Sequence, residues 1–205
     1  MSLRPLLKTG ALLAAALALS GCVSVLPKSK PARLYRFSAV EAAAPAGAAP
    51  TDRAALGLGP VTFDPPAAND RILTVNGQGT AYIEGARWVS PAPLLFQQAL
   101  IRTFDTTTGA PRLAERGGAL RAPAMLTLNV EAFEARYDQG EAAAPLVVVR
   151  VHAVIANNQT HAILGDKLFT ASVRAADNRQ GPIVAAFQGA AQQVLGDIAS
   201  WAARP

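Results

Sequence analysis

The chain has few of the residues on which metal and redox chemistry depend. Its 205 residues include one cysteine and two histidines. A structural metal site needs about four clustered Cys, His or acidic ligands, and His152 and His161 supply at most a pair on neighbouring strands. A single cysteine cannot form an internal disulfide. The sequence therefore predicts no metal site, and an exposed sheet face is the simpler place for the histidines.

Long apolar runs are also missing. A membrane-spanning helix takes about 20 consecutive apolar residues, and no segment of the chain reaches that length. The longest run, residues 11–19, follows Arg4 and Lys8 near the N-terminus. A basic region followed by a short apolar stretch and small residues is typical of a secretory signal peptide. The sequence thus predicts export rather than a membrane span.

The four residues Leu19-Ser20-Gly21-Cys22 match a bacterial lipoprotein processing site. We expect cleavage between Gly21 and Cys22 and acylation of the Cys22 thiol, which accounts for a lone cysteine in an exported chain. A signal peptide that ends beside a buried cysteine is the alternative. Val23 follows the cysteine where inner-membrane retention typically uses Asp, which favours the periplasmic face of the outer membrane.

Catalytic patterns are absent as well. No Gly-x-Ser-x-Gly elbow occurs, and no serine stands in a context typical of a nucleophile oriented by a base. Glu131 and Glu134 are typical of solvated strand residues rather than of an acid/base pair. The segment 57–59 (Gly-Leu-Gly) lacks the downstream acid of a dinucleotide site, so we interpret it as a strand that another group approaches closely. We predict a protein that is not an enzyme and needs no cofactor.

The charge is low and dispersed along the chain. The formal net charge is +5, and it falls to +3 when Arg4 and Lys8 leave with the signal peptide. Because no basic run alternates with aromatic residues, nucleic-acid binding is not expected. We predict three parts: a signal peptide (1–21), a tether (22–31) and one domain (32–205), in which the Ala/Pro-rich stretch 41–52 is a loop.

Alternating apolar residues predict strands, which lie at 32–40, 56–63, 72–75, 80–83, 111–115, 125–137, 146–155 and 161–174. Residues 76–79 (Asn-Gly-Gln-Gly) predict a hairpin turn. Within 125–137 the apolar parity shifts by one residue, which predicts a β-bulge near Glu131-Ala132. The strand 56–63 is a candidate exposed edge for self-association, and 146–155 is expected at the centre of the sheet.

Two helices are expected, at 91–106 and 182–203. Ser90 is the candidate N-cap of the first, with Pro91 in its first turn. This helix is long enough to be a crossover between parallel strands, whereas short turns make the later strands antiparallel. The predicted fold is one α/β domain with a mixed, largely antiparallel sheet and one helix on each face.

The two tryptophans allow different interpretations. Trp88 precedes the first helix, where it is either a core residue or an exposed anchor for partner docking. Trp201 continues the apolar stripe of the last helix, which favours the core.

Several segments, in this order, resemble the ABC-type transport auxiliary lipoproteins, the PqiC-like family. They are the lipobox, Leu34-Tyr35-Arg36-Phe37, Arg87-Trp88-Val89-Ser90-Pro91, Leu100, Phe133, Tyr137-Asp138 and the C-terminal helix. The resemblance implies a topology similar to the amino-terminal domain of TolB. It also implies a non-enzymatic lipoprotein that partners an MCE-domain protein and ABC permease and ATPase subunits in lipid transport. Only Cys22 carries a family function.

Two other functions fit the same features. A structural or regulatory lipoprotein, which activates a peptidoglycan synthase or assists outer-membrane assembly, would use the same anchor. An anchored hydrolase would need a polar cleft with a strained nucleophile, for which no residue is a candidate. The sequence leaves open whether the protein is a homo-oligomer.

Overall fold

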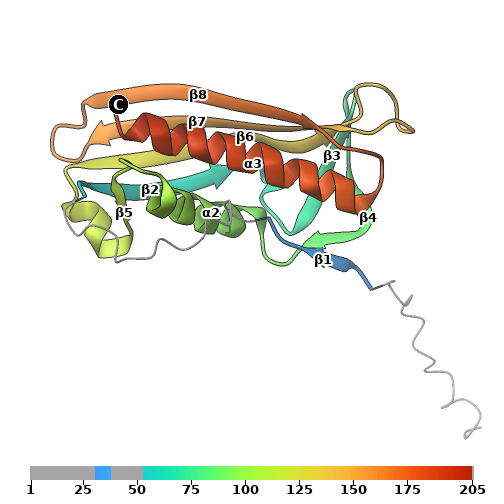
Figure 1. The fold of residues 1–205 in the computed structure, drawn as a ribbon, viewed down its shortest axis with the longest axis horizontal. Coiled ribbons are helices and arrows are strands. Elements are labelled where there is room, and N and C mark those ends of the chain that lie inside the picture. Colours follow the sequence, from blue (N-terminus) through green and yellow to red (C-terminus); the bar gives the residue numbers. More distant parts are fainter. Residues whose placement is uncertain (1–30, 38–52, 205) are drawn as a thin grey trace, which may run out of the picture. The chain divides into compact units, whose positions relative to one another are not determined.

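A computed structural model describes residues 31–37 and 53–204 of the chain. This part holds a mixed eight-stranded sheet and two α-helices (Figure 1), as the sequence predicted. The strands are β1 (Arg33–Tyr35), β2 (Ala55–Phe63), β3 (Arg71–Asn76), β4 (Gly79–Trp88), β5 (Arg112–Ala114), β6 (Ala124–Arg136), β7 (Leu146–Asn157) and β8 (Ile163–Arg174). The helices are α2 (Ala92–Thr106) and α3 (Gln180–Ala202), and the 3-10 turns are η2 (Pro65–Ala67) and η3 (Arg116–Arg121).

Strand β6 organises the sheet, because three strands pair with it. One edge of β6 is antiparallel to β7 along its whole length. Its other edge is shared, with β2 parallel to the first half and β3 parallel to the last residues. β7 is therefore central, as expected, and β8 pairs only with β7. The candidate edge 56–63 is covered at its start, since β5 pairs with Ala55 to Gly57 on the edge of β2 that β6 leaves open.

The predicted bulge in β6 is confirmed. Val130 lies opposite Val151, the next regular pair is Ala132 with Arg150, and Glu131 is the extra residue between them. Because side chains alternate along a strand, one extra residue returns Phe133 to the face that Val130 occupies. The one-residue shift in the apolar alternation of 125–137 therefore marks the position of the bulge.

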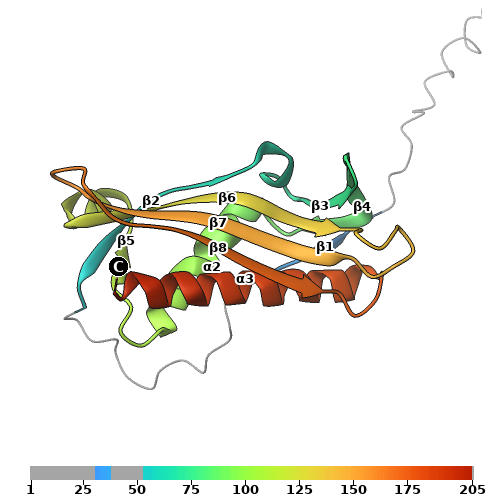
Figure 2. The same cartoon turned by 90° about the horizontal axis from the view of Figure 1, so that it is seen from above.

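Both helices cover the same face of the sheet, so the expectation of one helix on each face is wrong. α3 runs along β7 and β8 and also packs against α2 (Figure 2). The reason lies in the alternation of β6 and β7. Val149 and Val151 point toward the helices, whereas Arg150 and His152 point the other way. Since this face carries the continuous apolar stripe while the other face is interrupted by Arg150 and His152, both amphipathic helices are buried against it.

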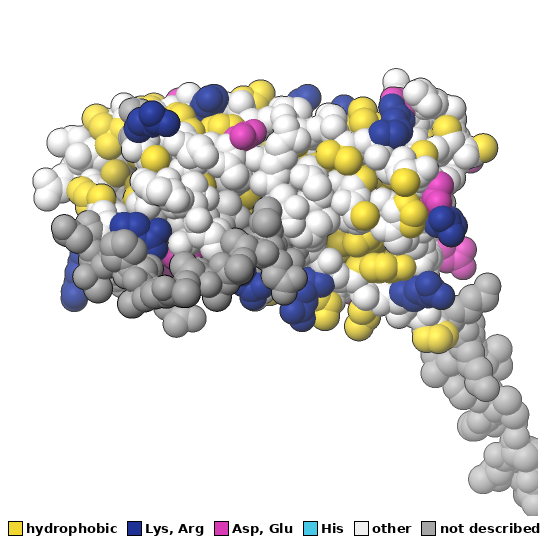
Figure 3. Space-filling view, in the orientation of Figure 1, with side chains coloured by type: hydrophobic (Ala, Val, Ile, Leu, Met, Phe, Trp, Pro, Cys, Tyr) yellow, Lys and Arg dark blue, Asp and Glu magenta, His cyan; other side chains and the backbone are white. Residues whose placement is uncertain are grey.

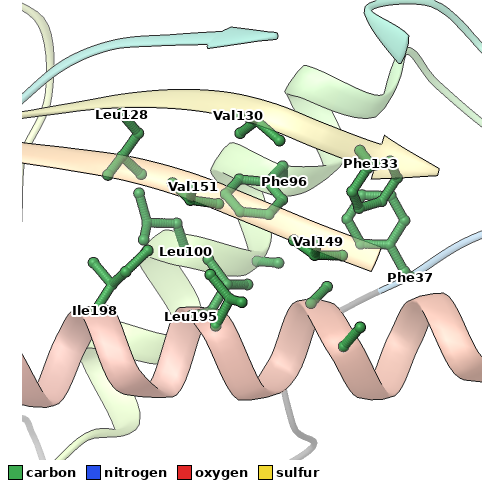
Figure 4. Close-up of a cluster of buried hydrophobic side chains, with 14 of the residues drawn as sticks. Phe37, Phe96, Leu100, Leu128, Val130, Phe133, Val149, Val151, Leu195 and Ile198 are labelled. Carbon is green, nitrogen blue, oxygen red and sulfur yellow. The ribbon is translucent and has the colours of Figure 1, made fainter. Parts of the chain in front are cut away.

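The core lies between this face and the two helices. Figure 4 shows that side chains of β6 and β7 point toward those of α2 and α3. Among its labelled residues are Leu128, Val130, Phe133, Val149, Val151, Phe96, Leu100, Leu195 and Ile198. All of these are buried, and full burial of such a side chain contributes roughly 1.5–3 kcal/mol. Trp201 at the end of α3 is partly buried against the same core, where its ring packs on Phe169 at 5.5 Å.

The connections differ in part from those expected. The hairpin is confirmed, with Gly77 in its turn at a φ of 57° that favours glycine. The strands before and after α2 do not pair, because β5 is parallel to β2 instead. α2 begins after Pro91, which occupies the N-cap without a side-chain hydrogen bond, so the expected Ser90 cap is wrong.

The interpretation of Gly57 as a point of close approach is confirmed. A Cβ at this position would lie 2.6 Å from the carbonyl oxygen of Ala119 in η3. The turn η3 therefore covers β2 from the side opposite the helices. Among the described residues no helix is long and apolar enough to cross a membrane. Residues 1–30 and the loop 41–52 lie outside the described residues, so the division into signal peptide, tether and domain stays a prediction.

Candidate functional surfaces

The predicted lipidation site cannot be placed in the structure. Gly21 and Cys22 lie outside the described residues, so cleavage and acylation stay predictions. The chain enters the described domain at β1, whose first residue is Arg33. The position of β1 therefore decides which end of the domain is nearest to Cys22 along the chain.

Trp88 is a core residue, and its interpretation as a docking anchor is wrong. The side chain is 2% exposed, which leaves no ring face for a partner. Its ring packs edge-to-face on Phe37 at 5.1 Å and on Phe187 of α3 at 5.3 Å. Trp88 thus connects β4 to the segment after β1 and to α3. Such aromatic pairs contribute about 0.5–1.5 kcal/mol beyond the burial of their area.

The neighbours of Trp88 hold the same junction together. Arg87 donates to both carboxylate oxygens of Asp70, at 3.0 Å each. The Val89 amide donates to the Tyr35 carbonyl oxygen and extends the β1–β4 pairing by one residue. The motif Arg87-Trp88-Val89-Ser90-Pro91 is therefore architectural: it fixes β1 at the point where α2 begins.

The two histidines do not come together. The His152 Nε2 lies 2.6 Å from the Asp166 carboxylate, across the β7–β8 pair on the helix-free face. His161 is exposed in the turn before β8, with a φ of 59°. About five strand positions, or roughly 16 Å, separate the two residues along the hairpin. No group of three or more potential metal ligands occurs in the part of the chain that the structure describes.

The carboxylates considered as an acid/base pair have a different arrangement. Glu134 accepts a hydrogen bond of 2.6 Å from the Arg136 Nε on the same face of β6. Glu131 is the bulge residue, and it is partly exposed. Neither carboxylate lines the cavity beside the end of α3, the one beside Tyr35 and Gln180 or the one beside the β3–β4 hairpin.

The family segment around Tyr137 ties two loops together. Arg174 of β8 donates to both oxygens of Asp138, at 2.5 and 2.7 Å, and this hydrogen bonding lowers the pKa of the Asp138 carboxyl. The Tyr137 hydroxyl donates to the Asn178 side chain at 2.7 Å. Burial, and secondarily the charge of Glu141, raise the pKa of Tyr137. These contacts join the β6–β7 loop to the segment that leads into α3.

One cavity lies where α3 ends. It has a volume of about 300 Å³ and is lined mainly by apolar groups, among them Leu56, Ala110, Ile155, Leu164 and Ala202. Its lining also includes Arg53, whose guanidinium group donates to the Phe104 carbonyl oxygen at 3.1 Å. A nucleophile, a base and an orienting group do not meet in this lining, so it offers no constellation for hydrolysis.

Six large apolar side chains of the described domain are exposed, three from the β1, β4 and α2 region and three from β8. The first group, which we call the β1 patch, consists of Leu34, Val89 and Leu94. The second group, the β8 edge, consists of Ile163, Leu164 and Leu168. Figure 3 shows hydrophobic side chains next to Lys and Arg side chains on the half of this face where β1 and β4 lie in Figure 1. Exposed apolar groups that cluster in this way mark interaction surfaces.

Both exposed groups were missed in the sequence. The signal for the β1 patch is the alternation of 34–37, in which Tyr35 and Phe37 face the core and Leu34 must face outward. For the β8 edge, the signal is that only one predicted strand follows 146–155 in the sequence. A last strand that is joined by a short turn pairs with its predecessor and can keep its other edge free.

The described residues form a mixed α/β domain, and comparison with known proteins identifies its family. The family model described as ABC-type transport auxiliary lipoprotein component matches residues 35–199. The chain therefore belongs to this family of lipoproteins, which is described as an auxiliary component of ABC-type transport. A search of curated proteins found no match.

Solved structures share the fold. A Xanthomonas campestris protein is similar with a TM-score of 0.69 and 18% identity, over 83% of this chain and 95% of that one. A second structure, of an uncharacterized protein, has a TM-score of 0.63 and 13% identity, over 84% and 99% of the two chains. At this level of identity the likeness shows the fold alone.

Proposed function

We propose that this chain is a lipoprotein anchored by acylated Cys22 in the outer membrane, with its domain in the periplasm. There it serves as the non-enzymatic auxiliary component of an ABC-type system with an MCE-domain subunit, which moves phospholipid or other hydrophobic molecules between the two membranes. The observation that carries the proposal is the order of two features in one chain: the lipobox at 19–22, and then a domain that the auxiliary-lipoprotein model matches from residue 35.

The chemistry of the domain supports a role by contact. Its ion pairs, such as Arg87 with Asp70 and Arg174 with Asp138, join the protein's own elements. The cavity beside the end of α3 has a mainly apolar lining. An anchored domain with exposed apolar groups at two places is suited to hold one partner while its lipid holds the membrane.

The anchor is the first point to test. Cys22→Ala should leave a folded domain that no longer fractionates with membranes, with transport of hydrophobic molecules lost. Ser24→Ala is the matched control, because it changes a neighbouring residue of the tether and keeps the thiol. A Cys22→Ala variant that fractionates like the wild type would contradict the proposal.

The second arm identifies the partner. The wild-type protein, extracted in detergent, should co-purify with an MCE-domain protein and with permease and ATPase subunits. Recovery of a peptidoglycan synthase instead would favour the structural or regulatory alternative. Val23→Asp tests the choice of membrane, since this change should move the protein from the outer to the inner membrane fraction.

A further inference from the structure

The length of chain between Cys22 and β1 limits how far the domain can stand from the membrane. Arg33 is the eleventh residue after Cys22. Each residue of an extended chain spans at most about 3.3–3.6 Å, so the start of β1 lies within roughly 40 Å of an anchored Cys22. Pro27 and Pro31 within this stretch restrict it further. An acylated Cys22 would therefore keep the side of the domain that carries β1 within this distance of the bilayer.

The same side of the domain exposes apolar groups. Leu34 is 64% exposed, Val89 40% and Leu94 52%. Leu34 lies opposite Arg87 in the parallel β1–β4 pair, and the Val89 amide donates to the Tyr35 carbonyl oxygen one step further along. Leu34 and Val89 therefore share the outward face of this pair. Leu94 follows in the first turn of α2, five residues after Val89.

The charge next to the β1 patch is basic. Arg33 and Arg36 flank Leu34, and both are exposed. Arg36 alternates onto the same outward face as Leu34, whereas Arg33 lies at the edge beside Tyr35 and lines a cavity with Gln180. The whole segment from residue 22 to residue 40 contains four basic residues and no acidic one. On the outward face of the β1–β4 pair, Arg87 is matched by Asp70. Among the described residues, neither Arg33 nor Arg36 forms an ion pair with an acidic side chain. An apolar patch flanked by such arginines is complementary to a bilayer surface with anionic phospholipid, because arginine places its guanidinium at phosphates while its stem stays apolar.

We propose that the β1 patch, with Arg33 and Arg36, rests on the bilayer that holds the Cys22 anchor. Leu34, Val89 and Leu94 enter the boundary between headgroups and acyl chains, and the arginines bind lipid phosphates. This inference rests on the proposed function in one respect, the acylation of Cys22. The anchored protein then contacts its membrane twice, once through lipid and once through its domain.

This contact orients the domain. The Tyr35 hydroxyl of β1 lies 3.2 Å from the Gln180 side chain at the start of α3. The 23 residues of α3 span about 34 Å, and Ala202 at the other end lines the same cavity as Leu164 of the β8 edge. With the start of α3 at the bilayer, the β8 edge is the exposed apolar group that faces away from it.

The lone cysteine allows a direct test. Acylation consumes the Cys22 thiol, so a cysteine introduced elsewhere is the single reactive thiol of the mature protein. Leu94→Cys and Leu168→Cys form a matched pair, since both parent side chains are 52% exposed and they belong to the two different groups. Each full-length lipidated variant is labelled with an environment-sensitive fluorophore and reconstituted into vesicles of phosphatidylethanolamine and phosphatidylglycerol.

The expected result is an asymmetry between the two positions. The probe at 94 should shift to the blue, and nitroxide-labelled lipids should quench it several-fold more than the probe at 168. Equal quenching at the two positions, or stronger quenching at 168, would overturn the inference. So would a probe at 94 that leaves water only when a partner complex is added, or only as protein concentration rises, because the occupant would then be a protein or a second copy.

A second arm tests the charge. Arg33→Gln/Arg36→Gln, placed in the Leu94→Cys protein, should remove most of the additional quenching that phosphatidylglycerol gives over phosphatidylcholine vesicles. The control pair is Arg112→Gln/Arg204→Gln, which removes the same charge beside the cavity at the far end of α3. An equal loss in the control pair would contradict a role for the two specific arginines.

The two proposals fail in different ways. If the wild-type Cys22 reacts with maleimide and the mass of the N-terminal peptide shows no acyl chain, the proposed function fails. If Cys22 is acylated and the probe at 94 stays in water, only the present inference fails. Thermal unfolding of each variant confirms that the domain is folded before either result is accepted.

Discussion

Tyr35 and Gln180 are 145 positions apart in sequence, and their side chains meet at 3.2 Å. The hydroxyl of Tyr35 donates to the Gln180 Oε1, and the Gln180 amide in turn donates to the Glu84 carbonyl oxygen at 2.8 Å. One glutamine thus joins β1 and β4 to the first turn of α3. In the sheet β1 pairs with β4 and not with a strand that α3 covers. The Tyr35–Gln180 hydrogen bond therefore connects β1 directly to α3.

Removal of the hydroxyl tests that link. Tyr35→Phe should lower the free energy of unfolding by about 0.5–1.5 kcal/mol, since one partly buried hydrogen bond is lost while the ring stays. Urea unfolding followed by circular dichroism measures the change. A double-mutant cycle with Gln180→Ala should show coupling between the two residues, and strictly additive effects would contradict the assignment.

Phe133 is the centre of the aromatic cluster. Its ring lies within 4.9–6.3 Å of five others, those of Phe37, Phe63, Trp88, Phe96 and Phe187. Phe133→Ala should destabilise the domain by about 3–5 kcal/mol, because the cavity cannot collapse between two helices and a strand. Phe133→Leu keeps most of the volume and should cost clearly less. Denaturant unfolding of the two variants compares them, and equal losses would argue against a packing origin.

Gly57 has a steric role, which a second glycine can control. Gly57→Ala places a Cβ 2.6 Å from the Ala119 carbonyl oxygen, so η3 must move. The expected loss is about 1–3 kcal/mol, as for other overpacked sites. In Gly196→Ala the new methyl has no neighbour within 4 Å, and helix propensity favours alanine by up to about 1 kcal/mol. Thermal unfolding should therefore shift in opposite directions in the two variants.

The Asp138–Arg174 pair predicts a pH dependence. The hydrogen bond from Arg174 lowers the pKa of Asp138 below its ordinary value of 3.8. Its stabilisation is therefore fully present above the unfolded pKa and is lost as the pH falls through the lowered value. Asp138→Asn should lower the unfolding temperature at neutral pH, and its difference from the wild type should shrink below about pH 4. Asp197→Asn on the exposed side of α3 is the control, and a difference that persists at low pH would contradict the assignment.

The sequence predictions were accurate where a structural feature depends on residues that are close together in the sequence. The bulge at Glu131 was predictable because the apolar alternation shifts by one residue between Val130 and Phe133, within a single strand. The close approach at Gly57 was likewise anticipated, because a strand keeps glycine where another backbone leaves no space. The strands, the hairpin and both helices follow from local periodicity in the same way.

The arrangement of these elements was harder to predict. β7 is rich in valine, and this composition concealed the alternation of Val149 and Val151 with Arg150 and His152 that sets one apolar face. Trp88 is apolar and precedes a helix in either interpretation, so only the tertiary contacts with Phe37 and Phe187 assign it to the core. The pairing of β5 with β2 joins residues more than fifty positions apart, which no local pattern specifies.

The extra residue in β6 has a consequence for how this chain can change length. A residue inserted or deleted between Val130 and Phe133 would invert the orientation of every side chain on one half of the strand, either the half beside β2 or the half beside β3. The loops at 76–79 and 157–162 can absorb such a change at the surface. Chains that share this fold can therefore vary in the length of their turns. The number of residues across the bulge is fixed, because β6 pairs with β2 before the bulge and with β3 after it.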